Sequence, residues 1–97
     1  MNNRYDPGFV ERVTITVLVD NKADMIVESS DTIQHFKEKP LLAEHGFSAL
    51  IHPGESGEMI LWDAGGSDVA LIENMCRMKL DFNTITKIAL SHGHWDH

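Results

Sequence analysis

A length of 97 residues, with 42% hydrophobic and 24% charged side chains, is typical of one small globular domain. The formal net charge of −7 argues against a nucleic-acid backbone as the main partner, because that partner requires a basic face. Cys76 is the only cysteine, so no intrachain disulfide can form, and no apolar run approaches the roughly 18 residues of a membrane span. Residues 1–7 are polar and unlike a signal peptide, so we expect a cytoplasmic protein without a membrane partner.

The first predicted element is a β-strand over residues 13–19. Valine and isoleucine alternate there with threonine, which is strand periodicity in β-branched residues. Residues 22–46 are mixed and polar, and we expect a long excursion with a helical turn near Asp31–Lys37. Two more strands are predicted over 47–52 and 58–62, and the turn at 53–57 should join them as a hairpin.

A helix is predicted over residues 68–79, where apolar residues recur at helical spacing after Ser67, a suitable N-cap. Cys76 falls on its predicted buried face, so we expect this thiol to serve in packing. Asn83 should cap one short turn, and residues 87–91 should form a short buried strand. The helix then covers one face of the sheet, and a second apolar set of residues lies on the other face.

The last six residues carry the clearest chemical pattern, His92-Gly93-His94-Trp95-Asp96-His97. Imidazole nitrogen and carboxylate oxygen are the ligands that zinc and other borderline divalent metals take. Gly93 is expected to let the backbone bend so that the neighbouring histidines converge on one ion. A histidine-rich tail or purification tag is the alternative, but tags are plain histidine runs.

This pattern resembles the His-x-His-x-Asp-His motif of the metallo-β-lactamase-fold superfamily, with Ser91 before the first histidine as in many members. A second match, Leu61–Gly66, looks like the Asp-x-Gly element of that family, in which Asp63 gives structural support to the metal loop. Residues 15–21 and 44–48 are similar to one branch of the superfamily. That branch contains dihydropterin ribofuranosylaminobenzene-phosphate synthase and uncharacterised metal-dependent hydrolases.

The resemblance implies that residues 1–97 are a partial metallo-β-lactamase-fold domain, truncated immediately after the metal-loop motif. The implied fold class is α/β: the N-terminal half of a four-layer αββα sandwich, built as a mixed β-sheet with one covering helix. His92 and His94 would be ligands of one metal ion, and Asp96 and His97 of a second. Complete members add a further histidine, a bridging aspartate and a final histidine from the C-terminal half, so both sites are incomplete in this chain. Two Zn²⁺ ions are implied, with Mn²⁺ or Fe as alternatives.

The function implied is that of a hydrolase in which a metal-activated water attacks an ester, amide, thioester or phosphoester of a small-molecule substrate. Asp96 is the candidate catalytic residue, as ligand of the second ion and as the group that orients the nucleophile. A pterin-linked phosphoribosyl transfer is the alternative that the branch implies. A di-iron centre is a third reading, but members of that kind use a carboxylate where this chain has Trp95 or Gly93.

A different class of function is a non-catalytic fragment that binds metal weakly and associates with itself or with a missing C-terminal half. A chain of this length buries only about 60% of its unfolded surface, so we predict a poor monomer. The remaining histidines, His35, His45 and His52, are expected to be ordinary surface or hydrogen-bonded side chains.

Overall fold

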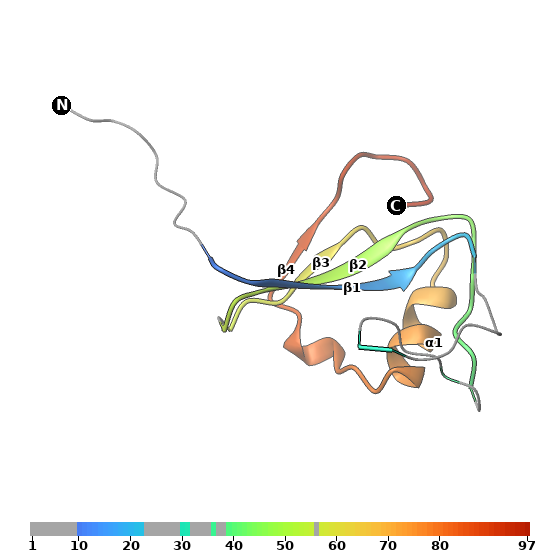
Figure 1. The fold of residues 1–97 in the computed structure, drawn as a ribbon. Helices are drawn as coiled ribbons and strands as arrows, with labels where there is room; N and C mark the ends of the chain where they lie inside the picture. The colour runs from blue at the N-terminus through green and yellow to red at the C-terminus, as the bar shows by residue number, and fades with distance from the viewer. Residues whose placement is uncertain (1–9, 23–29, 32–35, 37–38, 56) are drawn as a thin grey trace.

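The computed structural model describes residues 10–22, 30–31, 36, 39–55 and 57–97 (Figure 1). In chain order the elements are β1 (Val13–Val19), β2 (Ser48–Pro53), β3 (Ile60–Trp62), α1 (Ala70–Arg77), a 3-10 turn (Phe82–Thr84) and β4 (Lys87–Ala89). Within these residues, the chain is a small α/β unit with a four-stranded mixed sheet and one α-helix. No helix of this described part is long and apolar enough to cross a membrane.

The sheet has the strand order β1-β2-β3-β4. β1 pairs with β2 and β2 with β3 in antiparallel fashion, which confirms the predicted hairpin. β4 lies parallel to β3, with Leu61 opposite Ile88, because α1 carries the chain back across the sheet between them. Parallel pairing makes the ends of β3 and β4 meet at the same edge, and the segments that follow both strands start there.

The core lies between α1 and one face of β1, β2 and β3 (Figure 1). Leu18, Leu50 and Leu61 come from the strands, and Leu71 and Met75 come from the helix. Complete burial of such a side chain contributes about 1.5–3 kcal/mol. Among the described residues, few side chains are tightly buried in this core.

Helix α1 is shorter than predicted and presents a different residue to solvent. It runs over Ala70–Arg77 with Val69 as N-cap residue, and the Ser67 hydroxyl accepts a hydrogen bond from the Val69 amide at 3.2 Å. The buried residues are Ala70, Leu71, Asn74 and Met75. Cys76 was expected to pack in the core, but this was wrong: its side chain lies on the exposed side of the helix.

Asn74 is a buried polar residue of α1 that ties three parts of the chain together. Its side-chain amide donates to the carbonyls of Leu18, at 2.7 Å, and of Leu42, at 2.9 Å. Its Oδ1 accepts from the Leu42 amide at 2.7 Å. The end of β1 and the segment before β2 are therefore both fastened to the helix.

The opposite face of the sheet is apolar and uncovered by the described residues. Val13, Ile15 and Val17 are 47%, 62% and 48% exposed, and Trp62 extends this face onto β3. The predicted second apolar set is thus confirmed. β4 differs from expectation, because Ile88 is 67% exposed rather than buried. β4 lies at the sheet edge, beyond the strands that α1 contacts.

Two turn predictions have different outcomes. The helical turn near Asp31–Lys37 falls largely outside the described residues, as does His35. The short turn before β4 exists as a 3-10 helix, but its cap is Asp81 rather than Asn83. The Asp81 carboxylate accepts a hydrogen bond from the Asn83 amide at 2.9 Å, because a cap must precede the turn whose free N–H groups it accepts.

Candidate metal site

The candidate site forms where β3 and β4 end side by side. The Asp63 amide donates to the carbonyl of Ala89 at 2.9 Å, so the chain segments after the two strands start in contact. Asp63 has a left-handed backbone, with φ of 57°, which turns the chain into the Gly65-Gly66 corner. The parallel pair therefore places the Asp63 carboxylate beneath the loop of residues 91–97.

Asp63 is the anchor of this loop. Its side chain is 1% exposed, its Oδ1 accepts from the Ser91 amide at 2.7 Å, and its Oδ2 accepts from the Ser91 hydroxyl at 2.7 Å. The Nδ1 of His97 lies 2.7 Å from the same Oδ2. Burial by itself raises the pKa of Asp63, but the hydrogen bonds from Ser91 and His97 outweigh it and lower the pKa to about 2.

A chain of hydrogen bonds orients two of the loop histidines. The Ser91 Oγ lies 2.8 Å from Nδ1 of His92. A hydroxyl has one proton and Ser91 donates it to Asp63, so in the His92 contact Nδ1–H is the donor. In both His92 and His97, a hydrogen bond thus fixes Nδ1, and the lone pair of Nε2 is left to bind a metal ion.

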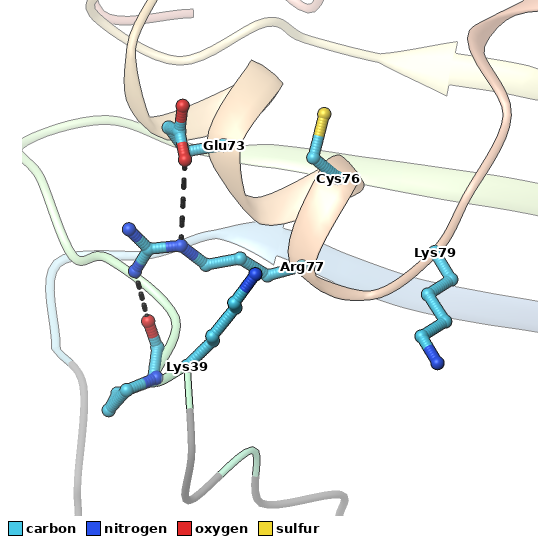
Figure 2. Close-up of a pocket in the computed structure, with 6 residues that line it drawn as sticks. Lys39, Glu73, Cys76, Arg77 and Lys79 are labelled. Carbon is cyan, nitrogen blue, oxygen red and sulfur yellow. Dashed lines mark hydrogen bonds and ion pairs between the residues drawn. The ribbon is translucent and has the colours of Figure 1, made fainter.

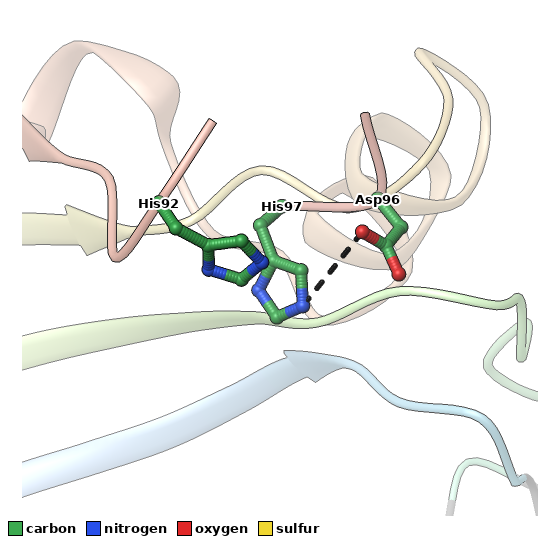
Figure 3. Close-up of side chains that lie close together, drawn as sticks. All are labelled: His92, Asp96 and His97. Carbon is green, nitrogen blue, oxygen red and sulfur yellow. Dashed lines mark ion pairs between the residues drawn. The ribbon is translucent and has the colours of Figure 1, made fainter. Parts of the chain in front are cut away.

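His92, Asp96 and His97 form a cluster that could hold a metal ion. One ligand atom from each of the three lies within 4.8 Å of the other two, and Figure 3 shows the side chains directed toward one another. The Nε2 of His97 is 3.9 Å from the Asp96 carboxylate. Asp96 and His97 are partly buried and His92 is exposed, so the cluster opens to solvent on one side.

His94, the fourth expected ligand, is not a member of this cluster. Its ring meets the edge of the His92 ring, with centroids 4.5 Å apart. Gly93, which was expected to be needed for the bend, has no left-handed backbone, and a Cβ there would meet nothing within 4 Å. Hydrogen bonds from neighbouring segments to the backbone of the loop hold it in position.

Those backbone contacts come from the segments before β2 and after β3. The Phe47 amide donates to the carbonyl of Asp96 at 3.1 Å, and the Ala64 amide donates to the carbonyl of His97. Gly46 lies so close that a Cβ would be 2.7 Å from the Asp96 carbonyl oxygen. The ligand-bearing loop is therefore held on two sides by closely packed backbone.

Two residues of the segment before β2 have roles that sequence reasoning missed. The Nε2 of His45 lies 3.2 Å from the Asp96 carboxylate, on the side away from His97. The Glu44 carboxylate accepts hydrogen bonds from the amide of Gly66, at 2.9 Å, and from the hydroxyl of Ser67, at 2.6 Å. The available signal was the position of both residues in segment 44–48, one of the two segments that carried the branch resemblance.

Trp95 lines the outer side of the loop. It is 73% exposed, and its ring lies close to Gly66, where a Cβ would be 2.7 Å from a ring carbon. The ring centroid is 5.7 Å from that of His45. Trp95 and His45 thus form one wall beside the Asp96 carboxylate.

A second hollow, near the end of α1, has charged groups that do not converge (Figure 2). Its volume is about 430 Å³, and its lining residues are Lys39, Pro40, Glu73, Cys76, Arg77 and Lys79. The Arg77 guanidinium is already held by Glu73, at 3.6 Å, and by the Pro40 carbonyl. In Figure 2 the Cys76 thiol points away from Arg77 and Lys39, so this hollow presents no assembled reactive group.

Comparison with known proteins finds a relative of moderate sequence identity. No family model matches the chain. The chain is similar to the uncharacterized protein MJ0448 of Methanocaldococcus jannaschii, with 39% identity over 83 residues. The match covers 86% of this chain and 26% of that protein, so the chain spans about a quarter of the length of the curated relative it matches.

Proposed function

We propose that this chain carries the metal loop of a metal-dependent hydrolase with the metallo-β-lactamase fold. The observation that supports the proposal is the convergence of His92, Asp96 and His97 above a buried Asp63. The sheet with one covering helix is compatible with half of the αββα sandwich. The activity belongs, in this proposal, to a protein longer than the chain, as the relative is.

The donor set fits a zinc ion. Two imidazoles and one carboxylate are the three-ligand combination found in many catalytic zinc sites, where a fourth position stays open. The contact of His97 with Asp63 has the arrangement expected of an outer carboxylate that orients a metal-binding histidine. The hydrogen bond between Ser91 and His92 orients the His92 ring in the same way.

The three-residue cluster favours one ion in this chain. The sequence pattern had paired His92 with His94 and Asp96 with His97 around two Zn²⁺ ions. In the structure His97 lies with His92, their ring centroids 4.3 Å apart, while His94 lies outside the cluster. A second ion would need further ligands from the longer protein. Within the loop, His94 is the histidine outside the cluster that could bind such an ion.

The chemistry of the site divides among these residues. A bound divalent ion would supply a water of lowered pKa and a positive charge beside the developing oxyanion of an ester, amide, thioester or phosphoester. Asp96, between His45 and His97, is placed to accept a proton or to orient the attacking group. Trp95 and His45 would form the side of the site that a small-molecule substrate meets.

A non-catalytic, weakly metal-binding chain is the second candidate. It is favoured by the cluster of three metal-binding residues, which is small for a two-ion site. It is also favoured by the exposed apolar face of the sheet, which would suit association with another polypeptide. Hydrolysis assays on the longer protein and its Asp96→Ala variant separate the two candidates. Metal-dependent turnover that Asp96→Ala abolishes supports the hydrolase, whereas absence of turnover in the metal-loaded protein supports the weak binder.

The metal site itself is tested by zinc titration of the chain in competition with a chelating dye. We expect one tight equivalent in the unsubstituted protein and its loss in His92→Ala and His97→Ala. Asp63→Asn should weaken binding about 10- to 100-fold, because Asp63 orients His97 directly and His92 through Ser91. His52→Ala removes a histidine outside the loop and should leave the affinity unchanged. Equal zinc affinity in all four variants would rule out this loop as the site.

A further inference from the structure

β1 is an edge strand, and its first five residues read the same in both directions. Within the described residues, it pairs with β2 on one side only. Residues 13–17 read Val-Thr-Ile-Thr-Val, the same in both directions around Ile15. The whole strand has no ionisable side chain, no proline and no glycine, whereas soluble proteins commonly protect an open edge with such residues.

The backbone groups that point away from β2 can be identified from the ladder. The Gly54 amide donates to the Arg12 carbonyl at 2.6 Å, and Pro53, opposite Val13, has no N–H to donate. Because hydrogen-bonded and non-hydrogen-bonded pairs alternate in an antiparallel ladder, Val13, Ile15 and Val17 direct their N–H and C=O groups outward. These three residues therefore present a regular row of donors and acceptors.

A groove follows this edge. It has a volume of about 690 Å³, and consecutive β1 residues, Arg12–Val17, line one side of it. Since neighbouring residues of a strand face opposite sides of the sheet, a groove lined by all of them runs along the edge. Asp31, Phe36, Leu41 and Met78 complete the lining, so apolar side chains lie beside the open backbone.

We propose that β1 pairs antiparallel with β1 of a second copy of this chain, about a two-fold axis at Ile15. Each Ile15 then exchanges both backbone hydrogen bonds with its counterpart, and Val13 does so with Val17 of the second copy. Thr14 lies opposite Thr16 of the second copy. Threonine pairs and β-branched pairs directly opposite each other stabilise an antiparallel ladder.

The absence of charge along the strand also favours self-association. Residues 13–19 carry no ionisable side chain, whereas the chain as a whole has a formal net charge of −7. In the proposed register, Arg12 comes opposite Leu18 of the second copy, Glu11 opposite Val19 and Asp20 opposite Val10. Two copies can therefore approach along β1 without bringing like charges directly opposite each other.

The register is tested by cross-linking in a Cys76→Ser background, which removes the exposed thiol. Ile15→Cys should join two copies through a short thiol-reactive cross-linker, because opposed residues in the ladder lie about 5.5 Å apart. Val13→Cys alone should not cross-link, since its counterpart lies about 14 Å away along the strand. Mixing Val13→Cys with Val17→Cys should restore cross-linking. Equal cross-linking of Ile15→Cys and Val13→Cys would overturn the proposal.

The oligomeric state provides a second measurement on the unsubstituted chain. Sedimentation should give twice the 10.9 kDa chain mass, and the midpoint of thermal unfolding should rise with protein concentration.

Ile15→Pro removes an outward N–H without removing a bond to β2, and should give a folded monomer. Trp62→Lys, on the apolar face two strands away, should remain dimeric. A monomeric unsubstituted chain, or a dimer that only Trp62→Lys dissociates, would overturn pairing at β1. β1 and β4 are the two edge strands of the sheet, and the metal loop follows β4, so either result leaves the zinc titration independent.

Discussion

The Asp63 carboxylate is the residue on which the geometry of the loop most depends. It is buried, accepts hydrogen bonds from the amide and hydroxyl of Ser91, and contacts His97. Asparagine also tolerates a left-handed backbone, so Asp63→Asn should preserve the backbone turn after β3. It replaces one of the two carboxylate oxygens that accept hydrogen bonds with an NH₂ group. We expect a loss of about 2 kcal/mol in the free energy of unfolding, measured in urea at neutral pH. Asp68→Asn, at an exposed carboxylate nearby, should change it little.

The same residue predicts an acid-dependent part of the stability. Its pKa is about 2 in the folded chain against a reference value of 3.8, so the folded state favours the ionised carboxylate. The resulting stabilisation is complete above about pH 4 and is lost as the pH falls toward about 2. The stability difference between the unsubstituted chain and Asp63→Asn should shrink over that interval. A difference that stays constant through it would contradict the assigned hydrogen bonds.

Gly46 and Gly93 give a matched pair of substitutions. A Cβ at Gly46 would lie 2.7 Å from the Asp96 carbonyl and 2.8 Å from the Gly66 amide, whereas a Cβ at Gly93 meets nothing within 4 Å. Gly46→Ala should therefore displace the loop, weaken zinc binding and cost about 1–3 kcal/mol in unfolding free energy. Gly93→Ala should leave both quantities nearly unchanged. The reverse order in urea unfolding and zinc titration would show that the bend of the loop depends on Gly93.

At the scale of elements, α1 holds its neighbours through Asn74 as well as through apolar packing. Asn74→Ala would leave the Leu18 and Leu42 carbonyls and the Leu42 amide without their partner, in a largely buried setting. We expect a loss of about 3 kcal/mol in unfolding free energy. Asn83→Ala, at an exposed site, should stay within about 0.5 kcal/mol of the unsubstituted chain. Equal stabilities of the two variants would show that Asn74 is not a tether.

The strands were predictable to different degrees. The alternation in Val13–Val19 identified β1 with its bounds, because a run of β-branched residues leaves little choice of backbone. β4 begins where predicted but ends at Ala89 rather than at residue 91. Its predicted burial was wrong, since Ile88 is apolar and yet exposed at the sheet edge. Local sequence indicates that a residue belongs to a strand, whereas the position of that strand in the sheet decides what covers it.

At the scale of the whole molecule, the sheet has a helix on one face and exposed apolar residues on the other. Val13, Ile15, Val17 and Trp62 give this second face its character. This exposure is the physical basis for expecting a poor monomer, because removing such surface from water is the main favourable term in association. Pairing at β1 would extend the apolar face across two copies, and a longer polypeptide could then cover it.

The sequence by itself determined which residue types could bind metal and where the regular elements lie. Three imidazoles and a carboxylate within His92–His97, after a strand, are local features that no distant contact can change. Only the tertiary structure decided which of these groups meet: His97 lies with His92 because Asp63, 34 residues before it, holds its ring, and His94 lies outside the cluster. The approach of His45 to Asp96 was likewise decided by the tertiary structure, since it depends on β2 and β3 pairing so that the segments beside them meet. Spacing along the chain limits what neighbouring side chains can do, while contacts between distant segments select the arrangement that is formed.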